Sequence, residues 1–231
     1  AVGRIPVYGT NSTQISYLDS ILTKTINYQD SSSTAWRKNY LGSAGFQNDG
    51  HTVDGAVMIE SFKDNICTPS SWSSTVLYQQ GSKAGTCDSS YTSDYELRGE
   101  SNGSNNNYHR YHWQQNNYGI SMWWGHGAQT YTIVGPNNAS DGYLFRNSYA
   151  SGLDDDYPAF LFPVSCNNGY PENSGNLCVS VLRNGGIGVM SPSRVSWYSV
   201  ATWQTSFLSS YSDNASYNYY TAKQMVEEDA T

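Results

Sequence analysis

Charged side chains are scarce in this chain: only 13% of its 231 residues are Asp, Glu, Lys or Arg. Basic residues are the rarer kind, because 12 Lys and Arg stand against 19 Asp and Glu, which gives a net charge of −7. An acidic chain is a poor partner for nucleic acid, whose phosphates require a basic face. Long apolar runs are also missing. No stretch approaches the roughly 20 apolar residues that cross a bilayer, so no membrane span is expected.

The length of 231 residues suits one domain with a sizeable core and is too short for two comfortable ones. With 20 Tyr and 21 Gly, and with Ser and Asn also abundant, uncharged groups must make the surface polar, as is common in secreted proteins. No charged, apolar leader precedes Ala1, where a strand-like segment begins directly. We therefore expect a single domain over residues 1–231, cut from a larger precursor.

Two apolar runs end abruptly at a chemically reactive side chain. The first covers residues 119–125 and is followed by His126, and the second covers residues 158–164 and leads through Ser165 to Cys166. Each run has the length of a buried strand. Parallel neighbouring strands would bring the imidazole and the thiol to the same end of one sheet.

These two residue types together suit nucleophilic catalysis on a carbonyl. A thiol attacks as its thiolate, and histidine takes up a proton near neutral pH. Gly127, next to His126, would leave a main-chain N–H free and let a substrate carbonyl approach without meeting a Cβ atom. Taken singly, Cys166 is equally typical of a small core residue and His126 of a loop histidine. Their occurrence together, with room for one connection between them, favours the catalytic interpretation.

The order of these motifs resembles that of the caspase-like cysteine peptidases and, within them, of the gingipains. Similar segments follow in the same order along nearly the whole chain, in residues 3–7, 18–28, 36–38 and 186–193. Between Cys67 and Asn117 the likeness is loose. The resemblance implies an α/β caspase-like sandwich, with a mostly parallel central sheet flanked by helices. The alternation of predicted strands and helices along the chain favours the same α/β class.

The resemblance also implies an activity and its residues. A gingipain-like chain would be a bacterial cysteine endopeptidase, secreted or on the cell surface, that acts on polypeptides and requires no cofactor. Cys166 would attack the peptide carbonyl, His126 would protonate the leaving amine, and the main-chain N–H groups of Gly127 and Cys166 would hold the oxyanion. Asp49 is the leading candidate for a third, orienting acid; a solvated loop carboxylate is the alternative.

Candidates for a specificity pocket follow from the same resemblance. Asp54 takes the position of the acidic residue that receives an arginine in gingipains, and Trp197 and Tyr198 resemble the aromatic rim of that pocket. An acid there would pair with an Arg or Lys before the cleaved bond. Asp54 is equally suited to cap the helix predicted to begin at Ala56. The two aromatic residues are also typical of a core edge.

Metal sites have weaker support. The acidic run of Asp154, Asp155 and Asp156 could bind calcium, as related secreted peptidases do, or form a solvated turn. His109 and His112 form an H-x-x-H pair, but no third ligand is in sight, so we expect no metal there.

The sequence contains four cysteines, and it does not decide whether two of them form a disulfide bridge. Cys67 and Cys87 flank a Ser-, Thr- and Gly-rich segment and either form a disulfide bridge or remain free thiols. Cys178 lies in a helix-like segment after Cys166 and is expected to be a packing residue.

Apolar periodicity predicts further elements. We expect helices over residues 11–28, 56–66, 176–182, 201–211 and 217–228. We expect a strand in the segment that begins at Ala1, and further strands over residues 39–41, 75–78 and 188–190. Residues 102–117, rich in Asn and Ser, are expected to form a surface loop.

An inactive caspase-like scaffold is the main alternative function, or a binding module that presents its Tyr and Trp side chains to carbohydrate or protein. Composition alone is a weak signal for such binding. The joint presence of His126-Gly127 and Ser165-Cys166 favours an enzyme, because an inactive scaffold has no reason to keep both pairs.

Overall fold

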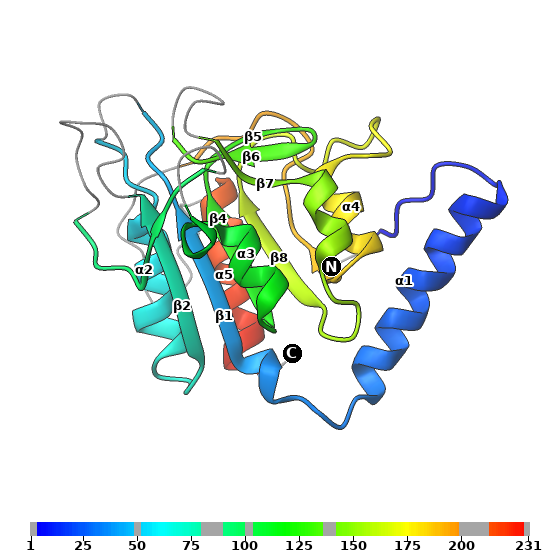
Figure 1. Cartoon of the computed structure of the whole chain (residues 1–231), viewed down its shortest axis with the longest axis horizontal. Helices are drawn as coiled ribbons and strands as arrows, with labels where there is room; N and C mark the ends of the chain where they lie inside the picture. Colours follow the sequence, from blue (N-terminus) through cyan, green and yellow to red (C-terminus); the bar gives the residue numbers. More distant parts are fainter. Residues whose placement is uncertain are drawn as a thin grey trace.

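The structure, a computed structural model, describes residues 4–48, 52–79, 90–99, 104–135, 142–198 and 213–228. Its centre is a six-stranded sheet in the order β3-β2-β1-β4-β8-β9, in which every neighbouring pair runs parallel (Figure 1). The strands are β1 (Asn39–Ala44), β2 (Ser73–Gln79), β3 (Tyr95–Leu97), β4 (Ile120–Trp124), β8 (Ala159–Val164) and β9 (Gly186–Val189). The predicted α/β class with a parallel central sheet is confirmed.

Helices cover both faces of this sheet, with α3 in front and α5 behind in Figure 1. One face packs against α2 (Ala56–Phe62), continued by a π-type turn η2 (Lys63–Cys67), and α5 (Asn214–Glu227). The other face packs against α3 (His109–Gln115) and α4 (Leu177–Arg183). The long helix α1 (Ser12–Asp30) stands at one side, in contact with α4 and β9. Single 3-10 turns form η1 (Ala35–Lys38), η3 (Asn105–Asn107) and η4 (Asn147–Gly152).

Buried residues alternate between the two cores along each central strand, as the two-residue period of a strand requires. In β4, Met122 and Trp124 pack with α2 and α5, whereas Trp123 packs on the opposite face, stacked on Phe145. A strand covered on both faces is apolar at nearly every position. This is the physical reason why the uninterrupted apolar runs in the sequence are strands.

Side chains that cap helices set where three of the helices begin. Asn11 accepts a hydrogen bond from Gln14 N at the start of α1, and Asn176 accepts one from Val179 N at the start of α4. Asp213 does the same for α5. Such caps satisfy main-chain N–H groups that have no partner within the helix. The predicted helices over residues 11–28, 176–182 and 217–228 are confirmed, and the one over 201–211 lies outside the described residues.

A small antiparallel sheet follows β4 after a single glycine, Gly125. It consists of β5 (His126–Ala128), β6 (Tyr131–Ile133) and β7 (Tyr143–Arg146). Figure 1 shows it across the end of the central sheet where β4 finishes. His126 is therefore the first residue of a hairpin strand rather than the end of β4.

Two predicted elements are wrong. Residues 4–9 form no strand, because no strand in the described part of the chain pairs with them, and Ile5 and Val7 are exposed. Residues 102–117 are not wholly a surface loop, because α3 begins at His109 and buries His109 and Trp113. The Asn-rich composition of this segment gave no signal for the short helix α3, whose buried face carries the rings of His109 and Trp113.

Buried cysteines behave as packing residues. Cys67 and Cys178 are free thiols with less than a tenth of their surface exposed, and burial raises the pKa of each to about 12. Cys178 lies in α4 and packs into the core, as predicted. Cys87 lies outside the described residues. None of the helices in the described ranges has the length and apolar character of a membrane span.

Candidate active site

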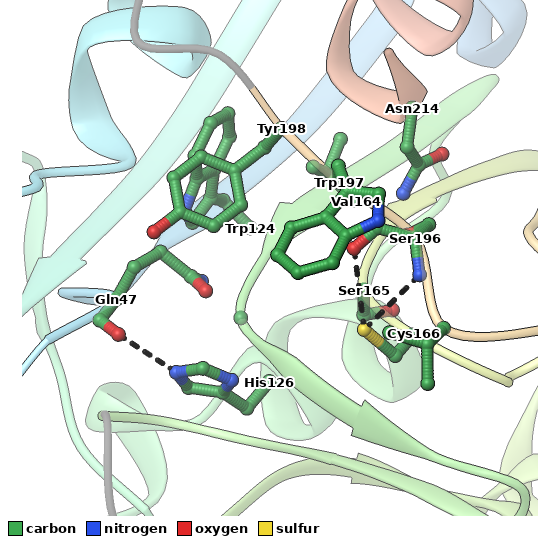
Figure 2. Close-up of a pocket in the computed structure, with 12 residues that line it drawn as sticks. Gln47, Trp124, His126, Val164, Ser165, Cys166, Ser196, Trp197, Tyr198 and Asn214 are labelled. Carbon is green, nitrogen blue, oxygen red and sulfur yellow. Dashed lines mark hydrogen bonds between the residues drawn. The ribbon is translucent and has the colours of Figure 1, made fainter.

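The predicted thiol and imidazole follow two neighbouring parallel strands and line the same cavity. The register of β4 and β8 pairs Trp124 with Val164 at the carboxyl ends of both strands. His126 and Cys166 each follow two residues later, and both line a cavity of about 330 Å³ (Figure 2). The structure thus brings together the two residues that the sequence singled out.

No hydrogen bond joins His126 to Cys166, two residues that the structure describes; each has a main-chain partner instead. Cys166 Sγ lies 3.5 Å from both the nitrogen and the carbonyl oxygen of Ser196. His126 Nε2 lies 2.8 Å from the carbonyl oxygen of Gln47. A carbonyl oxygen only accepts hydrogen bonds, so Nε2 carries the hydrogen and Nδ1 is the nitrogen able to accept a proton.

The main-chain oxygen of Gln47 therefore orients the imidazole. The sequence suggested a carboxylate, Asp49, for this position, and Asp49 lies outside the described residues. Gln47 has no sequence signal for this task, since every residue type carries the same carbonyl group.

Gly127 lies in direct contact with the main chain of Cys166. A Cβ atom on Gly127 would stand 2.3 Å from the carbonyl oxygen of Cys166 and 2.7 Å from its nitrogen. Real Cβ atoms do not approach main-chain atoms so closely, so only glycine fits without a backbone shift. The hairpin that begins at His126 is thereby packed against the end of β8.

A sharp turn follows Cys166. Asn167 has a φ of 58°, in the left-handed region that Asn tolerates better than most residues. Its N–H donates to the carbonyl of Arg194 at 3.0 Å, and Gly169 N–H donates to that of Pro192 at 3.0 Å. These bonds fasten the segment over residues 192–198 to the turn, which places Ser196 beside the thiol.

Aromatic and apolar side chains form most of the pocket wall (Figure 2). Trp124 and Val164 come from the central strands, and Asn214 comes from the start of α5. Trp197 and Tyr198 both line the pocket, the former 79% exposed. Tyr198 meets Trp124 edge to face, with ring centroids 5.1 Å apart. None of the described residues in the lining is acidic.

Asp54 is not among the residues that line this pocket. Its carboxylate accepts a hydrogen bond from Ala56 N at 2.9 Å, at the start of α2. The next residue, Gly55, packs against the indole of Trp124, since a Cβ on Gly55 would stand 2.3 Å from Trp124 Cδ1. Asp54 therefore accepts from the first residue of α2, although the N-cap position itself is Gly55 and not Asp54. One residue separates Asp54 from contact with the pocket wall.

The acidic run lies at the other end of β8 from Cys166. Asp155 accepts hydrogen bonds at 2.7 Å from Lys24 Nζ and at 2.7 Å from Gly185 N, and Asp154 accepts one from Asp156 N. The Lys24 side chain is only 4% exposed. Burial lowers the pKa of Lys24, and the hydrogen bond and charge of Asp155 partly offset this. Asp155 is thus already paired with a buried cation.

Both histidines of the H-x-x-H pair have partners within the protein. His109 is fully buried, with Nδ1 2.7 Å from Ser43 Oγ and Nε2 2.9 Å from Ser121 Oγ. Burial lowers the pKa of His109 to about 3, so the ring is neutral at pH 7. His112 Nε2 donates to the carbonyl of Asn106. Among the described residues, no group of His, Cys, Asp and Glu side chains is placed to hold a metal ion.

Comparison with known proteins identifies the family. The sequence profile of peptidase family C25 matches residues 1–229. The chain belongs to peptidase family C25. No curated protein matches this C25 chain.

Two solved structures share the fold of this C25 chain. One is the complex of Porphyromonas gingivalis RgpB pro- and mature domains, with a TM-score of 0.53, 14% identity, and coverage of 77% of this chain and 38% of that one. The other is the Arg specific cysteine proteinase gingipain R (RgpB), with a TM-score of 0.53, 15% identity, and coverage of 78% and 38%. The likeness confirms the caspase-like sandwich. This chain spans little more than a third of those chains, 38% in each case.

Proposed function

We propose that this chain is a cysteine endopeptidase in which Cys166 is the nucleophile and His126 transfers the proton. The observation that carries the proposal is the meeting of both side chains in one cavity, at the ends of adjacent parallel strands. His126 Nδ1 takes the proton of the Cys166 thiol, and the thiolate attacks the peptide carbonyl carbon. The same proton then passes to the leaving amine, which leaves an acyl-enzyme that water hydrolyses.

Two main-chain features support this chemistry. The Gln47 carbonyl accepts the Nε2 hydrogen of His126, so it stabilises the imidazolium that forms when Nδ1 takes the proton. The main chains of Gly127 and Cys166 are in contact, and we assign the oxyanion to the main-chain N–H groups of these two residues. A donor of this kind contributes about 3 kcal/mol to transition-state stabilisation.

For the residue before the cleaved bond we propose Arg or Lys. The aromatic walls of Trp124, Trp197 and Tyr198 suit the flat face of a guanidinium, and Asp54 lies one residue beyond Gly55, which packs on Trp124. The solved relative gingipain R is described as Arg specific. A lining without an acidic residue favours the competing choice, an uncharged side chain.

We also propose that the protein acts outside the cell or on its surface in a bacterium. The low charged fraction of 13% supports this, and one of the solved relatives is from Porphyromonas gingivalis. Immunodetection in the culture medium and on intact cells tests the location; exclusive recovery from the cytosol contradicts it.

Replacement of Cys166 by Ala tests the catalytic proposal. We expect hydrolysis of a mixed-sequence peptide library to be lost while the circular dichroism spectrum stays unchanged, because a half-buried thiol at a strand end contributes little packing. Iodoacetamide at pH 7 should inactivate the parent and label Cys166. Cys67 and Cys178, whose pKa values are about 12, should label only after unfolding.

Three outcomes contradict this proposal. They are undiminished hydrolysis by Cys166→Ala, full activity after complete labelling of Cys166, and a parent protein that binds polypeptides but cleaves none. The last outcome favours the inactive scaffold instead.

A further inference from the structure

One buried side chain joins the two segments that carry the proposed catalytic residues. Asn168 is 0% exposed and lies in the turn just after Cys166. Its amide nitrogen donates to the carbonyls of Ala128 at 2.6 Å and Tyr131 at 3.0 Å, one on each side of the β5–β6 turn. Its amide oxygen accepts from the hydroxyl of Thr132, at 2.9 Å, and from that of Ser165.

The partners determine which way the amide points. Two carbonyl oxygens can only accept, so the NH2 group must face Ala128 and Tyr131. The oxygen then faces two hydroxyl groups, which can donate to it. All four hydrogen-bonding positions of the Asn168 amide are used, so its side chain is fully satisfied without water.

Three of these four bonds, those with Ala128, Tyr131 and Thr132, cross between the two segments whose separation matters for catalysis. The fourth, from the hydroxyl of Ser165, lies within the segment that carries Cys166. Ser165 immediately precedes Cys166, and Thr132 pairs with Gly127 in the hairpin register. The hairpin also begins with His126, so Asn168 ties the nucleophile's strand end to the strand that carries the proton acceptor and the proposed oxyanion donor.

We propose that Asn168 is a positioning residue that sets the distance between Cys166 and the β5–β6 hairpin. This inference rests on the proposed function, because it assigns Asn168 to the alignment of that chemistry. Asn168 does not line the pocket, so it acts through its neighbours and touches no substrate. Misplacement of a reacting group by about 1 Å costs roughly 100-fold in rate.

The turn keeps other attachments when the side chain is changed. The main-chain carbonyl of Asn168 accepts a hydrogen bond from Cys178 N at 3.2 Å, and Gly169 N donates to Pro192. Substitution of the amide therefore leaves the turn docked on α4 while removing the hydrogen bonds of the Asn168 side chain to the hairpin. The hydroxyl of Thr132 still lies 3.3 Å from that of Ser165.

Asn168→Asp is the sharpest test. The change keeps size and one acceptor oxygen but turns an oxygen toward the carbonyls of Ala128 and Tyr131, which pushes the hairpin away. We expect kcat per titrated Cys166 to fall about 100-fold, with KM changed less than about threefold because the pocket wall is untouched. The alkylation rate of Cys166 by iodoacetamide should change far less than kcat, because alkylation needs neither the oxyanion donors nor the proton transfer to an amine.

Asn176→Asp is the matched control. Asn176 is a second buried amide, 2% exposed, whose nitrogen also donates to two carbonyls, those of Tyr170 and Asn173. It caps α4 and makes no hydrogen bond to the hairpin. Asn176→Asp should lower thermal stability as much as Asn168→Asp does while keeping kcat within about threefold. Equal losses of kcat in both variants overturn the proposal, since they indicate a general structural effect.

If Asn168→Asp does not fold, Thr132→Val tests whether Asn168 positions the hairpin. It removes one hydroxyl that donates to Asn168 and introduces no charge. Loss of one such bond, about 1 kcal/mol, should lower kcat about fivefold. An unchanged kcat per titrated thiol in whichever variant folds overturns the role of Asn168. Cys166→Ala in the same assay separates the two proposals, because its residual activity bears on the nucleophile alone.

Discussion

Gly127 and Cys166 touch main chain to main chain, at a distance that leaves no room for a side chain on Gly127. We predict that Gly127→Ala lowers kcat/KM at least about 100-fold, because the added methyl group must push the hairpin away from the nucleophile. The measurement is steady-state hydrolysis per titrated Cys166, alongside circular dichroism to verify the fold.

Gly175→Ala is the matched control for this change. A Cβ atom on Gly175 would meet Asn173 Oδ1 at 3.5 Å, an ordinary contact. Activity within about twofold of the parent is expected there, since no backbone has to move. Full activity in Gly127→Ala contradicts the assignment of this contact to catalysis.

Asp54 has two candidate roles that two substitutions separate. Asp54→Asn keeps an oxygen for Ala56 N and removes only the charge, whereas Asp54→Ala also removes the hydrogen bond and should cost about 1 kcal/mol of stability. If the carboxylate pairs with a basic substrate side chain, the Asn variant loses a preference for Arg and Lys over Leu of about 10-fold or more. Peptides that differ only before the cleaved bond provide the measurement. Equal turnover of all three peptides by the parent excludes Asp54 from specificity and favours an uncharged-residue pocket.

His109 makes the stability of the fold depend on pH. Its pKa is about 3 in the fold against 6.5 for an unperturbed histidine, so the unfolded chain binds more protons between these values. The free energy of unfolding therefore falls as the pH is lowered from about 6.5 toward 3, by up to about 1.4 kcal/mol per pH unit. Urea unfolding of the parent and of His109→Asn at several pH values isolates this contribution. If the free energy of unfolding changes with pH in the same way for both proteins, His109 is not the source of this pH dependence.

Asp155 stabilises a buried cation. Asp155→Asn leaves the Lys24 ammonium with the carbonyl of Leu182 as its remaining hydrogen-bond partner within the described residues. We expect a loss of about 2 kcal/mol, less than for a fully buried pair because the Asp155 side chain is 54% exposed. Asp154→Asn, in the same exposed turn, should stay within about 0.5 kcal/mol. A thermal-unfolding shift on adding calcium that Asp155→Asn abolishes contradicts this account and supports the calcium site.

Local patterns were enough to predict the strands that present the site. The runs that became β4 and β8 are apolar at nearly every position, with Ser121 as the polar exception, because both faces of a parallel sheet are covered. The helices capped by Asn11 and Asn176 were also predictable, since a capping side chain acts within its own first turn. The strand-like start of the chain misled over residues 4–9, because a strand also needs a neighbouring strand that offers unpaired N–H and C=O groups.

The orienting group of His126 could not be predicted in the same way. A main-chain carbonyl belongs to every residue, so Gln47 had no signal in the sequence. The family resemblance suggested a carboxylate, Asp49, which lies outside the described residues. Asn168 was visible as a turn residue, but its four partners come from segments that only folding brings together.

The sequence by itself determined which side chains carry reactivity and which stretches are buried strands, because both follow from residue type and short-range periodicity. Only the tertiary structure decided that the thiol of Cys166 and the imidazole of His126 share a cavity, which imidazole nitrogen accepts a proton, and that His109 is neutral. Those properties depend on strand order, main-chain contacts and burial, which arise between residues far apart in the chain.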